Sequence, residues 1–275
     1  MTGPRRIVCL TEETTETLYL LGQQDRIVGV SGFTVRPPEA RRKPKVSAFT
    51  SAKIEKILEL RPDLVIGFSN LQAQIAHDLI RAGVTVLVTN QRSVEEILET
   101  ILMVARVVAA EAAGIVLVDR LRAGLDLIAQ SARAFLRRPR VFFEEWMDPL
   151  ISGIRWVDEL IEIAGGDPVF PGLRHEHDAA KRIVTPAAVV AANPDVIVAS
   201  WCGRKVNLDQ IRVREGWSAI RAVRDNRIFE VKSTYILQPG PAALTDGIQQ
   251  LHAILSSVAP AVLLPASSSK EIPTS

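Results

Sequence analysis

The chain carries one segment twice: LELRPDLVIGFS at residues 58–69 and VAANPDVIVAS at residues 190–200. In each copy a helix end precedes an x-Pro-Asp sequence, and proline stops a helix and pushes the residue before it toward extended geometry. The apolar run that follows is typical of a strand buried on both faces. Because the copies lie in opposite halves of the chain, they predict two similar α/β lobes. Clefts between such lobes are preferred ligand sites.

Strands and helices alternate outward from both copies, which predicts mostly parallel sheets. The SVEE sequence at residues 93–96 is a capping box that opens a helix. A longer helical pattern covers residues 111–137 and would span about 40 Å, roughly the width of a lobe. Residues 31–50 and 144–149 read as loops. Further strands are expected at residues 7–10, 25–30, 84–88, 140–143 and 227–231.

We therefore predict an α/β protein of two similar lobes with mostly parallel sheets, joined by one long helix, with a ligand cleft between the lobes. The expected boundaries are residues 1–110 for the N-terminal lobe, 111–138 for the connecting helix, 139–260 for the C-terminal lobe and 261–275 for a disordered tail. Ligands of parallel sheets bind outside the carboxyl ends of the strands.

Composition narrows the classes of function. The net charge of +2 in 275 residues indicates no nucleic-acid partner, and 47% hydrophobic residues suffice for two cores. Cys9 and Cys202 are the only cysteines, which excludes a disulfide framework and a zinc-type cysteine cluster. No apolar run is long enough for membrane insertion, and no signal peptide precedes the first strand. We expect a cytoplasmic protein, or a periplasmic one if a leader has been removed.

Three stretches carry a resemblance to a known family: RIVCLT at residues 6–11, RPDLVI at residues 61–66 and RVFF at residues 140–143. On these stretches the chain resembles the helical-backbone (class III) substrate-binding proteins of ABC importers, and among them the cobalamin-binding members. The family serves importers of cobalamin, siderophores, haem and metal ions. The resemblance covers roughly residues 5–260. It implies binding without catalysis, no required cofactor, cobalamin as a possible ligand, and an ABC permease as partner.

The chain departs from this family at its docking positions. Members dock on the permease through one surface glutamate per lobe. The first position falls near Gln74, and the second loop offers Arg204 and Lys205. A cytoplasmic partner therefore stands as an alternative to the permease.

Acidic and aromatic residues follow the predicted strands. Glu12 and Glu13 follow the first strand and either cap the next helix or face the cleft. Phe68 ends the repeated strand, where a family aromatic would pack on a ligand. Glu144, Glu145 and Trp146 open the second lobe, and we expect a site role for at least one of these acids, with helix capping by Asp148 as the alternative.

The loop after the second copy adds Trp201 and Cys202. The tryptophan would stack on a flat macrocycle, and the thiol would ligate a soft metal centre or pack as a small apolar group. Gln238 lies in a rigid QPGP turn that would place it at the cleft mouth. His175 and His177 are weak metal candidates in a stretch that a solvated loop explains as well.

The leading hypothesis is a cleft-type binding protein for a bulky cofactor-like ligand, cobalamin or another corrinoid. Aromatic rings would supply apolar area, and the acids would accept hydrogen bonds from ligand amides. An acidic lining argues against anionic siderophores. The alternatives are a cytoplasmic sensor, or an enzyme acting on a metal chelate through Glu144, Glu145 and Cys202. The sequence has no Walker loop or G-x-G-x-x-G fingerprint to support an enzyme.

Overall fold

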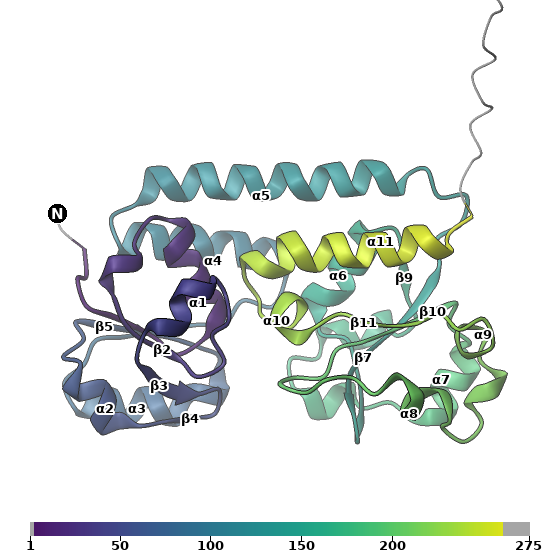
Figure 1. The fold of residues 1–275 in the computed structure, drawn as a ribbon, viewed down its shortest axis with the longest axis horizontal. Coiled ribbons are helices and arrows are strands. Elements are labelled where there is room, and N and C mark those ends of the chain that lie inside the picture. Colours follow the sequence, from purple (N-terminus) through teal and green to yellow (C-terminus); the bar gives the residue numbers. More distant parts are fainter. Residues whose placement is uncertain (1–2, 261–275) are drawn as a thin grey trace, which may run out of the picture.

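The structure, a computed structural model, describes residues 3–260, and the predicted tail at 261–275 lies outside the described residues. Two α/β lobes lie side by side beneath the long helix α5 (Glu111–Ala132), which spans both (Figure 1). This helix packs on α4 (Val94–Val107), and also on α6 (Arg155–Ile163) and α11 (Ile248–Val258). The predicted fold class, two mostly parallel α/β lobes joined by one long helix, is confirmed.

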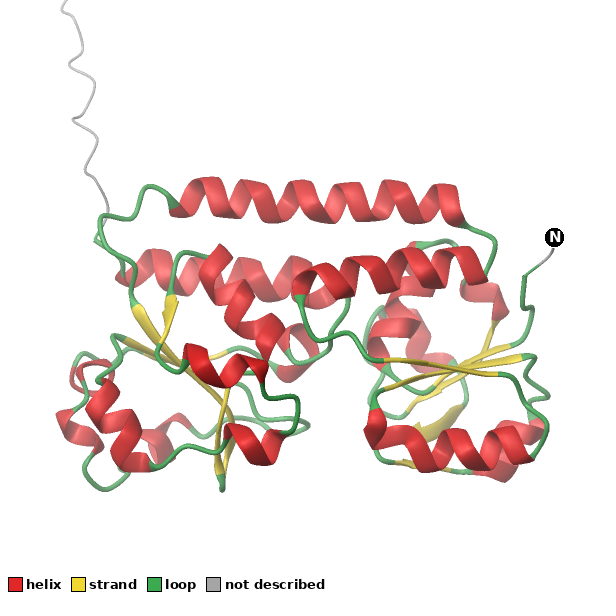
Figure 2. Ribbon diagram, turned by 180° about the vertical axis from the view of Figure 1, so that it is seen from behind, coloured by secondary structure: helices red, strands yellow, loops and turns green. Residues whose placement is uncertain are grey.

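The N-terminal lobe contains a six-stranded sheet of order β4-β3-β2-β1-β5-β6, parallel except for the β3–β4 pair. Helices cover both of its faces (Figure 2). Its strands are β1 (Ile7–Cys9), β2 (Ile27–Ser31), β3 (Lys45–Ala48), β4 (Ser51–Ala52), β5 (Leu64–Phe68) and β6 (Val86–Thr89). Its other helices are α1 (Glu12–Leu20), α2 (Ile54–Glu59) and α3 (Ala73–Arg81), with 3-10 turns at Gln24–Arg26, Pro38–Arg42 and Asn70–Gln72.

The C-terminal lobe repeats this plan around β7 in the order β11-β10-β7-β8, and β9 also pairs with β7. Its strands are β7 (Arg140–Met147), β8 (Leu150–Ser152), β9 (Asp167–Pro168), β10 (Val196–Ala199) and β11 (Ile228–Glu230). Its other helices are α7 (Pro186–Ala192), α8 (Leu208–Arg212), α9 (Arg221–Arg224) and α10 (Ser233–Ile236), and a π-helical turn (Ala243–Gly247) leads into α11. Its 3-10 turns are Pro171–His175, Ala179–Arg182 and Trp217–Ala219.

The repeated x-Pro-Asp sequence performs the same task in both lobes. Asp63 donates its backbone N–H to the carbonyl of Arg6 at 2.9 Å and accepts the N–H of Arg6 on its carboxylate at 2.9 Å. Asp195 makes the same two bonds with Arg140, at 2.8 and 2.9 Å. Each aspartate thus aligns the start of the central strand, β1 or β7, with its parallel neighbour, β5 or β10. This reciprocal pairing explains why the repeat predicts the fold.

The structure differs from the sequence prediction in three segments. Residues 31–50 contain β3, which extends the sheet, where a loop was expected. Strand β7 continues through residues 144–147 because it forms an antiparallel pair with β8. Helix α5 ends at Ala132 and not at residue 137, since the chain turns to bring the ring of Phe135 onto His252, with centroids 5.6 Å apart.

Candidate functional site

A cavity of about 590 Å³ lies between the two lobes. Many of the segments that line it follow the carboxyl ends of β1, β2, β3, β5 and β6 in one lobe and of β10 and β11 in the other. This is where ligands of open parallel sheets bind. Much of the wall is apolar, and both lobes contribute to it: Phe33, Phe49, Phe68, Ile154, Trp156 and Leu237.

The lobes approach each other closely along one side of this cavity. A side chain at Gly203 in the C-terminal lobe would come within 3.9 Å of the ring of Phe33 in the N-terminal lobe. The ring of Phe33 is nevertheless 48% exposed, so it has apolar surface left to cover a ligand. Trp156 is held from behind, because its indole N–H donates to the carbonyl of Ile236 at 2.9 Å.

Many of the polar groups in the wall are neutral. Hydroxyl and amide side chains come from both lobes: Thr11, Ser31, Asn70, Ser233, Thr234 and Gln238. Such groups both donate and accept hydrogen bonds, so they suit a ligand with many amides or hydroxyls.

Two buried arginines also reach the cavity. Arg182 is 1% exposed and grips Glu145 with two bonds, at 2.5 and 3.1 Å, while it also donates to the carbonyl of Ser152. Arg92 is 7% exposed and lies with its Cζ atom 5.0 Å from the centroid of the Phe68 ring. The charge of Arg182 is thus neutralised inside the protein, whereas Arg92 makes no ion pair in the part of the chain that the structure describes.

Glu12, at the start of α1, is a buried acid in the cavity wall. Burial, followed by the neighbouring acids Glu13 and Glu16, raises the pKa of Glu12 to about 8. Its carboxyl is therefore largely protonated at neutral pH and can donate as well as accept a hydrogen bond. Its Oε1 atom is buried without a hydrogen-bond partner.

Five of the nine predicted ligand-binding residues line this cavity: Glu12, Phe68, Glu145, Cys202 and Gln238. They come from five segments, which the two sheets bring together at their carboxyl ends. Whether they bind a ligand remains a prediction. His177, a weak metal candidate, also lines the cavity, but His175 does not. Residues 3–260 contain no group of three or more His, Cys, Asp or Glu side chains placed to hold a metal ion.

The structure corrects the expected position of Trp201 and Glu144. Trp201 is 2% exposed and packs in the core of the C-terminal lobe, where its indole N–H donates to Glu144 at 3.0 Å. Glu144 is fully buried and also accepts two bonds from Arg214, at 2.5 and 2.8 Å. Because β7 continues as a strand, Glu144 points into the lobe and both side chains serve its core.

Glu13 and Trp146 also lie outside the cavity wall. Glu13 is 4% exposed, accepts a bond from the Thr11 hydroxyl and packs against Gly240. Trp146 donates to the carbonyl of Asp148 at 3.0 Å at the tip of the β7–β8 pair. Neither side chain lines the cavity of about 590 Å³, where the sequence predicted both. With Glu144 and Glu13 elsewhere and Glu145 neutralised by Arg182, the wall is not acidic as expected.

Sequence reasoning did not single out Arg92, Arg182, Phe33 or Phe49. A usable signal existed for Arg92, which directly precedes the capping box and follows a strand at its carboxyl end. Phe33, Phe49 and Arg182 had no such sequence signal. No strand was recognised within residues 31–50, and Arg182 lies far in sequence from Glu145.

Polar contacts cross between the lobes at a contact that we call the joint. Arg36 bonds Glu16 at 2.9 Å within its own lobe and Asp246 at 2.7 Å across the joint. Glu16 in turn accepts the N–H of Ala242 at 3.1 Å, and Gln91 donates to the carbonyl of Pro239 at 3.0 Å. These crossing bonds support a largely preformed cleft.

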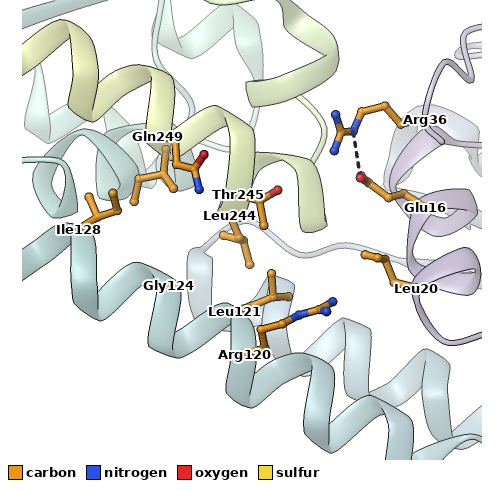
Figure 3. A pocket seen from close by; sticks show the side chains of 11 residues that line it. Glu16, Leu20, Arg36, Arg120, Leu121, Gly124, Ile128, Leu244, Thr245 and Gln249 are labelled. Atoms are coloured by element: carbon orange, nitrogen blue, oxygen red, sulfur yellow. Dashed lines mark hydrogen bonds and ion pairs between the residues drawn. The ribbon is translucent and has the colours of Figure 1, made fainter. Parts of the chain in front are cut away.

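A second cavity, of about 300 Å³, lies between this joint and α5. Figure 3 shows Arg36 facing Glu16 on one side of it and Leu121 and Arg120 of α5 below. Gly124 forms part of the wall, and a side chain there would meet nothing within 4 Å.

The fold and the cleft define a bilobal α/β binding protein, and comparison with known proteins agrees. The model of the family described as "Periplasmic binding protein" matches residues 7–235, so the chain belongs to this family. The predicted resemblance is thereby confirmed.

Several relatives cover nearly the whole chain. An uncharacterized ABC transporter substrate-binding lipoprotein of Bacillus subtilis is 29% identical, over 90% of this chain and 79% of its own. A vitamin B12-binding protein of Vibrio parahaemolyticus is 25% identical, over 89% and 87%. The solved structure of the periplasmic heme-binding protein RhuT from Roseiflexus sp. RS-1 is 27% identical, covers 92% of this chain and 100% of its own, and superposes with a TM-score of 0.78.

A cytoplasmic location has no support from these relatives: RhuT is named a periplasmic protein and the Bacillus subtilis relative a lipoprotein. Within residues 3–260, no helix is both long enough and apolar enough for a membrane span.

Proposed function

We propose that the cleft binds a corrinoid such as cobalamin and that the loaded protein delivers it to an ABC importer. The observation that carries this proposal is the cavity of about 590 Å³, which has aromatic faces from both lobes and neutral hydrogen-bonding groups around them. A corrin ring presents an apolar face and a periphery of amide side chains, which such a wall complements. Relatives named vitamin B12-binding proteins support the assignment.

Haem is the second candidate, and a specific observation favours it. His177 and Cys202 both line the cavity, and imidazole and thiolate are ligands of haem iron. The similarity to RhuT, named a heme-binding protein, supports the same reading. On a bound corrinoid, one of these two side chains would replace an exchangeable axial ligand of the cobalt.

Delivery to a permease requires a docking surface. Gln74, at the position where the family has an acid, lies exposed on α3 and donates to Asp78 at 2.9 Å. An acid is therefore present one helical turn away, and we propose that Asp78 supplies the negative charge of the first lobe in docking.

Titration of the purified protein with cyanocobalamin, hydroxocobalamin and haemin tests the ligand assignment. Trp156 lies in the cavity wall, so quenching of tryptophan fluorescence reports binding. Saturable binding of cyanocobalamin supports the proposal, and binding of haemin alone moves the assignment to haem. A spectral shift with hydroxocobalamin but not with cyanocobalamin would indicate His177 or Cys202 on the cobalt.

A matched pair of variants tests the site itself. Phe33→Ala combined with Phe49→Ala removes apolar area from the cavity wall, and each buried Phe is worth about 1.5–3 kcal/mol. The affinity should fall by about tenfold or more. Leu127→Ala removes a side chain that is 66% exposed on α5 and should leave the affinity unchanged. Equal affinity of all three proteins would place the ligand elsewhere.

A further inference from the structure

Arg92 is a buried cation whose hydrogen-bonding capacity is almost unused. A guanidinium has five N–H donors. In Arg92 one nitrogen, Nη2, donates to the side chain of Asn90 at 3.0 Å, and the buried Nε has no partner. Burying a charge without a partner costs free energy, so native proteins seldom contain a buried unpaired charge. The structure therefore holds a cation whose partner is not among the described residues.

The neighbouring charges do not supply that partner. Glu145 and Asp178 act on Arg92 only through space, and Glu145 spends both oxygens on Arg182. Burial, followed by repulsion from Arg182, lowers the pKa of Arg92. An anion beside Arg92 would offset both the cost of burying its charge and the repulsion from Arg182.

Access decides what kind of anion fits. Arg92 lies in the cavity wall, with its guanidinium beside the ring of Phe68. A partner must therefore enter through the cleft, and its anionic group would lie next to an apolar body packed on Phe68. This describes a ligand that carries both features in one molecule.

We propose that Arg92 binds an anionic oxygen group, a carboxylate or a phosphodiester, carried by the ligand of the cleft. This inference rests on the proposed function of the cleft and deepens it by assigning a specificity-determining residue. Arg182, already paired with Glu145, forms the neighbouring part of the wall, and its buried Nε atom has no hydrogen-bond partner among the described residues. The ligand class is thus narrowed to a bulky, partly apolar molecule with at least one fixed negative charge.

The experiment compares ligands that differ in that charge. Cyanocobalamin has a phosphodiester that dicyanocobinamide lacks, and haemin has carboxylates that its dimethyl ester lacks. Arg92→Gln should weaken binding of the charged member of the recognised pair by about tenfold or more, the value of a charge-assisted hydrogen bond. Binding of the uncharged member should change by less than about twofold. The pair that shows the difference identifies the anion as a phosphodiester or a carboxylate.

Two further variants distinguish loss of the positive charge at Arg92 from a general loss of structure. Arg92→Lys keeps a positive charge and should recover part of the affinity. Arg81→Gln removes an exposed arginine of α3 and should bind like wild type. If Arg92→Gln binds both members of each recognised pair as wild type does, the proposal is wrong.

An independent measurement covers the case in which neither tetrapyrrole binds, which would refute the proposed function. The ¹⁵N-labelled side-chain Nε–H resonance of Arg92 is then followed while inorganic phosphate is added. A saturable shift, absent in Arg92→Gln, would uphold an anion site for a different ligand class. No shift, together with no tetrapyrrole binding, would overturn the inference as well.

Discussion

Replacing Asp195 by alanine should destabilise the C-terminal lobe by about 2–5 kcal/mol. The Asp195 side chain is 2% exposed and accepts the backbone N–H of Arg140 at 2.9 Å, a part-buried charge-assisted bond worth about 1.5–3 kcal/mol. It also pairs with Arg137 at 2.8 Å and Arg221 at 2.6 Å. Those two arginines are 52% and 44% exposed, so each pair adds only about 0.2–1 kcal/mol.

The assay is urea unfolding followed by tryptophan fluorescence. All four tryptophans of the chain belong to the C-terminal lobe, so their signal reports on that lobe. The loss of stability is read from the midpoint at unchanged m-value. Asp209→Ala, which removes an aspartate that is 87% exposed, is the matched control and should change stability by less than about 0.5 kcal/mol.

The difference should also depend on pH. Burial alone would raise the pKa of Asp195, but the N–H of Arg140 and the guanidinium groups of Arg137 and Arg221 hold it below its ordinary value. A lowered pKa means that the stabilisation is present above the unfolded pKa and is lost as the pH falls through the folded one. Wild type and Asp195→Ala should therefore converge in acid. A loss no larger than that of Asp209→Ala, or one that persists unchanged in acid, would refute the anchoring role of the repeated aspartate.

Three further substitutions test the core, the cleft and the joint. Trp201→Ala should cost about 3–5 kcal/mol in urea unfolding because the ring is core and not cleft; a fold of wild-type stability with lost ligand binding would contradict this placement. Glu12→Gln removes an acid whose pKa rises from its ordinary 4.5 to about 8. Between these two pKa values the folded wild type keeps a proton that the unfolded chain has released, so its stability falls as the pH rises. The Tm of Glu12→Gln should therefore rise relative to that of wild type between about pH 5 and about pH 8. A Tm difference that stays constant over this range would argue against the raised pKa of Glu12. Gly240→Ala would place a Cβ 2.4 Å from that of Glu13 and should lower stability by about 1–3 kcal/mol. Gly172→Ala, whose Cβ would meet nothing within 4 Å, should leave stability unchanged. Equal melting curves for the two variants would show that the contact between the lobes adjusts to the added methyl group.

Local signals in the sequence predicted most of the framework. The x-Pro-Asp repeats predicted β5 and β10, and the SVEE sequence predicted the start of α4, where Ser93 and Glu96 form the expected reciprocal bonds. These signals work because proline geometry and helix capping act within a few residues. The extent of β7 was not predictable in this way, because its continuation depends on pairing with β8.

The cleft shows the limit of such reasoning more clearly. The sequence placed Glu12, Phe68, Glu145 and Cys202 after strands and Gln238 in a turn at the cleft mouth. The common topology of parallel sheets brought them together. The same reasoning from strand ends also predicted Glu13, Glu144, Trp146 and Trp201 in the cleft, but these four residues lie outside the cavity wall.

Tertiary structure alone decided which charges are neutralised. Glu144 meets Arg214, which is 70 residues away, and becomes part of the core; Glu145 meets Arg182, 37 residues away. The guanidinium of Arg92 forms no ion pair within residues 3–260 and is left in the cavity wall. A side chain's type and sequence position do not determine whether its charge has a partner, because that depends on which distant segment the fold packs against it.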